Sequence, residues 1–112
     1  MTTLLALHRR PDGGPEALKT FERAYADQHL PLIAQTPGLE GLRVERVTEA
    51  LGGGTDLCLV ATMDFADRAA LDAGLASDAM RAAGRSLRQI APGRATLLVL
   101  EDADDLLPEA RR

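Results

Sequence analysis

The sequence contains no tryptophan, one tyrosine, two phenylalanines and one cysteine among its 112 residues. Since aromatic residues make up only 3% of the chain and hydrophobic residues 46%, leucine, valine and alanine must build the core. The lone cysteine, Cys58, excludes an internal disulfide and favours a reducing compartment. The net charge of −4 and the lack of stacking aromatics argue against a nucleic-acid partner.

Long apolar runs are also absent, and none approaches the ~20 residues of a membrane span. The N-terminal stretch "MTTLLALHRRP" places its apolar residues before its basic ones, the reverse of a secretory signal. We therefore expect a cytoplasmic protein with no membrane partner. The length predicts one domain over residues 1–101, followed by a charged tail over 102–112 that lies on the surface or frays.

Hydrophobic periodicity divides the domain into seven segments. Short apolar runs bounded by turn residues predict strands at 3–9, 42–50, 56–65 and 94–101. Helical spacing and capping residues predict helices at 15–29, 68–76 and 78–90. The glycines at 52–54 form a turn that joins the predicted strands at 42–50 and 56–65 into a hairpin. The order β-α-β-β-α-β predicts an α+β, ferredoxin-like fold, with a four-stranded antiparallel sheet and helices on one face.

Three of the four predicted strands carry apolar residues on both faces. The first has Leu5 and Leu7 on one face and Leu4 and Ala6 on the other, and the last has Leu97 and Val99 against Leu98 and Leu100. The third has Leu57, Leu59, Ala61, Met63 and Phe65 on one face and Asp56, Cys58, Val60, Thr62 and Asp64 on the other. Two helices cover only one face of such a sheet. We therefore expect a homodimer in which two sheets pack face to face, and the alternative is a monomer with scattered surface leucines.

One helix face carries the main candidate for chemistry. Leu18, Phe21, Tyr25 and His29 recur at helical spacing, and Pro31 should kink or stop the helix just after His29. His29 has three open roles: it faces a ligand, it binds carbonyls that Pro31 leaves free, or it stands in solvent. An imidazole pKa near 6.5 suits acid–base catalysis, and the helix C-terminus should favour its protonated form.

Other residues are weaker candidates for the same cleft. Tyr25 either orients a substrate oxygen or is a core aromatic, and His8 either borders the cleft or is a surface residue at a strand end. Phe21, Met63 and Cys58 are further candidates for the cleft. Met63 and Phe65 fit either the core or the cleft wall, and a lone cysteine such as Cys58 is otherwise most simply an inert buried side chain. No group of His, Cys and acidic residues has ligand spacing, "LGGGTD" precedes a strand rather than a helix, and a single helical histidine is thin evidence for haem. We expect no metal and no cofactor.

The segment "YADQHLPLIAQTPGLEGLRVERV" resembles the signature of the EthD family. The matching motifs are H-x-P-L, at His29, Pro31 and Leu32, and P-G-L, at Pro37, Gly38 and Leu39. The start "LHRRPDG", the helix pair at 67–82 and the end "APGRATLLVLE" are similar too, so the resemblance covers about residues 3–101. It implies a dimeric α+β barrel, in which two protomers join through their sheets and each has a cleft between sheet and helices.

The resemblance implies fold more than reaction, because proteins of this architecture include lactone isomerases, polyketide cyclases, cofactor-free monooxygenases and haem-handling proteins. Muconolactone isomerase relatives use a histidine that matches His29 together with helper cysteines, and Cys58 matches none of those. We expect a protein that binds a small, mostly apolar organic molecule. It would be a cofactor-free isomerase or cyclase with His29 as general acid/base and Tyr25 orienting an oxygen. The alternative is a non-catalytic ligand-binding or accessory protein of an oxidative degradation pathway.

Overall fold

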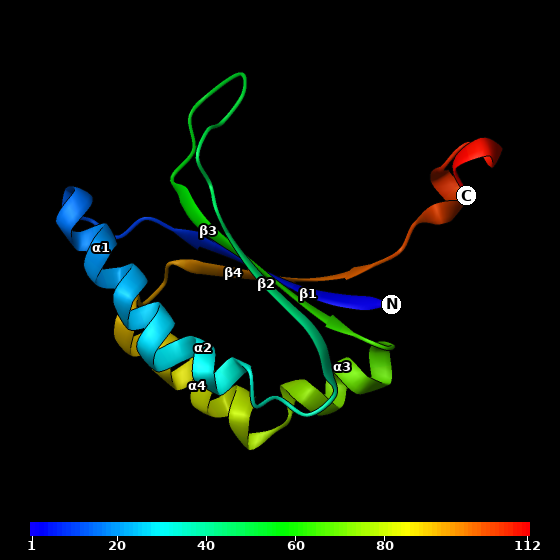
Figure 1. The fold of residues 1–112 in the computed structure, drawn as a ribbon, viewed down its shortest axis with the longest axis horizontal. Coiled ribbons are helices and arrows are strands. Elements are labelled where there is room, and N and C mark those ends of the chain that lie inside the picture. The colour runs from blue at the N-terminus through cyan, green and yellow to red at the C-terminus, as the bar shows by residue number, and fades with distance from the viewer.

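A computed structural model describes residues 1–112 as one antiparallel sheet with its helices on a single face (Figure 1). The elements are β1 (Thr2–Arg9), α1 (Gly14–Ala24), the π-helical turn η1 (Tyr25–His29), α2 (Leu30–Ile33), β2 (Leu39–Arg46), β3 (Leu57–Phe65), α3 (Arg68–Leu75), α4 (Asp78–Ile90) and β4 (Ala95–Glu101). The strand order is β2-β3-β1-β4, and each neighbouring pair is antiparallel. The predicted α+β, ferredoxin-like fold is confirmed.

Side-chain caps set the beginnings of the two later helices. The Asp67 carboxylate accepts a hydrogen bond from the Ala70 amide at 2.8 Å, and the Ser77 hydroxyl accepts one from the Met80 amide at 3.2 Å. Each cap satisfies an amide that the first helical turn leaves unpaired. The sequence predicts both caps because each residue directly precedes a helical pattern.

The first helix does not stop at His29, so that part of the prediction is wrong. The chain stays helical to Ile33 through η1, where the Leu30 amide bonds to the Tyr25 carbonyl, five residues back rather than four. A proline ring clashes with the carbonyl four residues before it in a regular helix, and the wider π-turn accommodates Pro31 without ending the helix.

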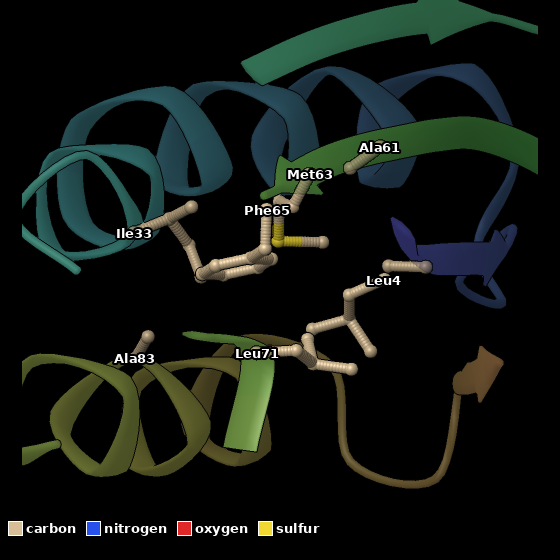
Figure 2. Close-up of a cluster of buried hydrophobic side chains, with 8 residues drawn as sticks. Leu4, Ile33, Ala61, Met63, Phe65, Leu71 and Ala83 are labelled. Atoms are coloured by element: carbon tan, nitrogen blue, oxygen red, sulfur yellow. The ribbon is translucent and has the colours of Figure 1, made fainter. Parts of the chain in front are cut away.

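The core between sheet and helices is aliphatic around one aromatic ring. Eight buried residues form its main cluster: Leu4, Ala6, Ile33, Ala61, Met63, Phe65, Leu71 and Ala83. Figure 2 shows the Phe65 side chain reaching from β3 toward Ile33, with the Met63 side chain beside it. The Phe65 side chain has no exposed surface, so it anchors the sheet to the helices.

The Phe65 ring leaves no room for a residue larger than glycine at position 74 of α3. A Cβ atom at Gly74 would lie 2.8 Å from Phe65 Cε2 and 3.1 Å from Thr36 Cγ2. We expect Gly74→Ala to lower the free energy of unfolding by about 1–3 kcal/mol, as overpacked cores typically do. Chemical denaturation measures this change.

Gly84 on α4 is the matched control, because its nearest neighbour is the flexible Arg88 Nη1 at 3.5 Å. We expect Gly84→Ala to stabilise the chain by up to about 1 kcal/mol through helix propensity alone. Equal stability changes in the two variants would contradict the packing argument.

The outer face of the sheet, on the side away from the helices, carries the predicted leucines on β1 and β4, whereas β2 and β3 add polar residues such as Arg43 and Thr62. Leu5 pairs across with Leu98, and Leu7 pairs with Val60. Directly paired residues share a face, so these side chains and Leu100 form one surface. Leu98 and Leu100 are each 41% exposed, and no helix of the chain covers them.

Beyond β4, residues 102–112 extend away from the body (Figure 1). They contain two short 3-10 turns, Asp104–Leu106 and Glu109–Arg111, and every residue of the segment is exposed. None of the helices combines the length and the apolar character needed to cross a bilayer.

Candidate functional site

A cleft of about 110 Å³ lies between the helix-facing side of the sheet and the helices. Its walls are mostly aliphatic, with Leu4 and Ala61 from the sheet and Met80 and Leu87 from α4. Only three of the lining side chains carry nitrogen or oxygen: His8, Tyr25 and His29. An apolar cavity with a few convergent polar groups is the usual form of a small-molecule site.

His29 is held in one orientation by the facing helix. Its side chain is 5% exposed, and its Nδ1 lies 3.0 Å from the carbonyl oxygen of Ala83. Because a carbonyl only accepts, Nδ1 carries the proton and donates. In the neutral ring Nε2 is then a free acceptor, and it has no hydrogen-bond partner in the protein. His29 therefore lines the cleft, and the alternative that it stands in solvent is wrong.

Burial lowers the pKa of His29, although the hydrogen bond to the Ala83 carbonyl opposes this effect. The expectation that a helix end would favour the charged form is wrong, because the helix continues past His29 to Ile33 and burial is the largest effect on the histidine. His29 is neutral at pH 7, as a general base must be.

His8 and Tyr25 form a buried pair beside His29. The Tyr25 hydroxyl and His8 Nε2 are 3.0 Å apart, and their ring centroids are 4.9 Å apart in an edge-to-face arrangement. His8 is 1% exposed, so the interpretation of it as a surface residue is wrong. The alternation of β1 explains this position, since Leu4, Ala6 and His8 all face the helices.

Burial and the neighbouring His29 lower the pKa of His8 to about 4. Burial is also the main cause of a raised pKa for Tyr25, with a smaller contribution from Cys58. All three polar side chains of the cleft are therefore uncharged near neutral pH. The cleft can supply a neutral base and neutral hydrogen-bond donors.

The remaining predicted cleft residues separate into two groups. Met63 lines the cleft, whereas Phe21 and Cys58 belong to a second buried cluster that also contains Tyr25. Phe21 packs against Tyr25 with ring centroids 5.6 Å apart. Phe21 therefore packs against the tyrosine ring but does not line the cleft.

Cys58 does not follow the predicted alternation of its strand. The β1–β3 register shifts between His8, which pairs with Leu59, and Arg9, which pairs with Leu57. This β-bulge at Cys58 lets it join Leu59 in the cluster beneath α1. Cys58 is 6% exposed, and burial raises the pKa of its thiol, so the sulfur stays protonated.

Sequence reasoning missed two parts of the site. The Ala83 carbonyl, which orients His29, is a backbone group that no residue type reveals. Leu42 and Leu97 line the cleft from the two edge strands, and only the strand order brings them there. No group of three or more His, Cys, Asp or Glu side chains is arranged to hold a metal ion.

No family model and no curated protein matches the chain. Among solved structures, an EthD family protein from Bacillus halodurans is 26% identical, with 91% of this chain and 98% of that chain covered and a TM-score of 0.81. A dimeric ferredoxin-like protein of unknown function from Jannaschia is 21% identical, covers 91% and 100% of the two chains and has a TM-score of 0.65. SnoaB, a cofactor-independent oxygenase from Streptomyces nogalater, is 18% identical, covers 96% and 97%, and has a TM-score of 0.60.

The first of these similarities confirms the predicted resemblance to the EthD family, in sequence as well as in fold. The other two, at lower identity, show the fold alone.

Proposed function

We propose that this EthD-like chain binds a small, mostly apolar organic molecule in the cleft and catalyses a cofactor-free proton transfer on it. The observation that carries the proposal is the hydrogen bond of His29 Nδ1 to the Ala83 carbonyl, which leaves Nε2 without a partner on a side chain that lines an aliphatic cavity. In a buried histidine with a purely structural role, both ring nitrogens would normally be hydrogen-bonded.

The three polar side chains support a specific division of work. His29 Nε2 takes a proton from a carbon next to a substrate carbonyl, and the ring later delivers a proton to another atom of the same molecule after exchange with solvent. When His8 Nε2 donates to the Tyr25 oxygen, the tyrosine hydroxyl is free to donate to the substrate oxygen as negative charge develops there. The net change is an isomerisation or a cyclisation, with no oxidant or reductant.

We also propose that the protein is a homodimer joined through the outer faces of its sheets. The leucines Leu5, Leu98 and Leu100, which adjoin one another on β1 and β4, support this assembly, because large apolar patches on a protein surface usually mark an interface. The dimeric ferredoxin-like neighbour from Jannaschia supports it by similarity of fold.

Deuterium exchange tests the chemistry directly, because it detects the abstraction of a proton whatever product forms. The chain is incubated in D₂O with a panel of small unsaturated lactones and β-dicarbonyl compounds, and NMR follows the loss of the C–H signal. We expect exchange to be accelerated by the unaltered protein and to fall about 10²–10⁴-fold in His29→Gln. Glutamine keeps an N–H donor but has no basic nitrogen, so folding should be retained.

Tyr25→Phe is the companion variant, since it keeps the ring and removes only the hydroxyl. We expect a smaller loss of rate from it, because the hydroxyl stabilises charge and does not take the proton. A folded His29→Gln protein that exchanges protons at the full rate would remove His29 from the mechanism.

The accessory-protein alternative has one observation in its favour: no charged side chain lines the cleft to stabilise an ionic intermediate. Thermal shift separates the two functions, because a ligand that binds only the native state raises the unfolding temperature. Stabilisation by a compound of the panel without proton exchange would favour the accessory function.

A further inference from the structure

Residues 102–112, here called the arm, have internal structure but do not rest on the body of their own chain. The Arg112 guanidinium donates to the carbonyls of Asp105 at 2.9 Å and Leu107 at 2.8 Å, which ties the two 3-10 turns together. Asp102, where the arm begins, pairs with the N-terminal amine at 3.7 Å, and every hydrogen bond beyond it stays within the arm. The arm leaves the end of β4 and points away from the helices (Figure 1).

The arm presents apolar surface to water. Leu106 is 80% exposed and Leu107 is 40% exposed, although burial of a leucine is worth about 1.5–3 kcal/mol. Acidic residues lie on both sides of the two leucines. These charges alone would keep a tail without a partner soluble, so solubility does not require the leucines. Their exposure indicates a surface that another molecule covers.

The helix-facing side of β4 also exposes apolar side chains to solvent. Leu97 is 56% exposed and Val99 is 40% exposed, because β4 is an edge strand that the helices do not fully cover. Leu97 is also the most exposed residue that lines the cleft, and Leu87 of α4 lines the same cleft. The cleft therefore reaches the surface at β4, where Leu97 and Val99 form an apolar strip.

We infer that the arm of each protomer packs on the helix-facing side of β4 in a second copy of this chain and closes the mouth of that copy's cleft. The inference rests on the proposed homodimer. Continuity with that interface favours a second copy as the occupant: the arm extends β4, whose outer face carries Leu98 and Leu100 into the dimer contact. The cleft would then be complete only in the dimer.

Charge complementarity supports this placement. Asp104 and Asp105 of the arm form no ion pair within the chain, and neither do Arg85 and Arg88 on the exposed side of α4. The Arg88 guanidinium lies beside Gly84, a residue that lines the cleft. An acidic arm thus meets a basic rim at the mouth of the cleft, which would orient the arm as it docks.

Disulfide trapping with Leu97→Cys and Leu106→Cys in one chain tests the inference. The only natural cysteine, Cys58, is buried and should stay out of the reaction. After oxidation of a dilute sample, we expect most of the protein to run as a covalent dimer on a non-reducing gel, and mass spectrometry should place the bond between residues 97 and 106 of different chains. The control pairs Leu106→Cys with Leu51→Cys, since Leu51 is 89% exposed on the β2–β3 loop.

Three outcomes would overturn the inference: equal cross-linking of the control, a bond between residues 97 and 106 of one chain, or no bond at all. Sedimentation of the unaltered chain separates this failure from that of the proposed assembly. A dimer that does not cross-link at these positions removes only the arm contact, whereas a monomer removes the homodimer as well. The proton-exchange assay stays an independent measure of the chemistry.

Discussion

Replacing Leu5 with lysine should convert the proposed dimer into single, folded chains. Leu5 lies on the central strand β1, in the middle of the outer face, with Thr62 and Leu98 paired on its two sides. A two-fold axis brings each substituted position into the interface twice, and an unpaired charge buried there costs several kcal/mol. We expect the dissociation constant to rise by a factor of at least about 10³, as two such costs imply. Analytical ultracentrifugation over a dilution series measures it.

Leu51→Lys is the matched control for this experiment, because Leu51 is 89% exposed at the far end of the β2–β3 hairpin. It adds the same charge and should leave the association unchanged. Circular dichroism of the Leu5→Lys protein checks that the sheet persists. If the Leu5→Lys chain stayed dimeric at nanomolar concentration, the outer face would not be the interface, and another surface would have to cover these leucines.

Acid should unfold the protein earlier than its carboxylates alone would cause, because His8 is buried in its neutral form. The native pKa of His8 is about 4, against an ordinary value of 6.5 that the unfolded chain regains. The unfolded state therefore binds more protons in this range. The stability present above pH 6.5 is lost as the pH falls toward 4, by up to about 3 kcal/mol from this residue alone. The lowered pKa of His29 acts in the same direction.

Urea denaturation at a series of pH values, at one protein concentration, measures this loss. His8→Gln is the informative variant, since glutamine can still bond to the Tyr25 hydroxyl but does not titrate. We expect it to flatten the slope of stability against pH between 6.5 and 4. A variant with the same slope as the unaltered chain would mean that His8 takes up its proton in the folded state without cost.

Three positions where prediction and structure differ have separate physical causes. Local rules place Pro31 at a helix end, Cys58 on the outer face and His8 at the surface. In the structure, a π-turn carries the helix past the proline, a β-bulge turns Cys58 inward, and β1 places His8 beneath α1 and η1. The bulge at Cys58 depends on the pairing of β3 with the distant strand β1. The position of His8 follows the alternation of β1, and the π-turn accommodates the ring of Pro31.

The sequence by itself determined the order of the elements, the caps at Asp67 and Ser77, the two-faced apolar strands and the EthD-like motifs around His29. These features follow from periodicity and side-chain chemistry, which are local and readable along the chain. Only the tertiary structure decided that His8 meets Tyr25, that the Ala83 carbonyl fixes the proton of His29 on Nδ1, and that Leu97 opens the cleft at a sheet edge. Those contacts join residues far apart in the chain, and one of them uses a backbone carbonyl, so neither spacing nor residue type could reveal them.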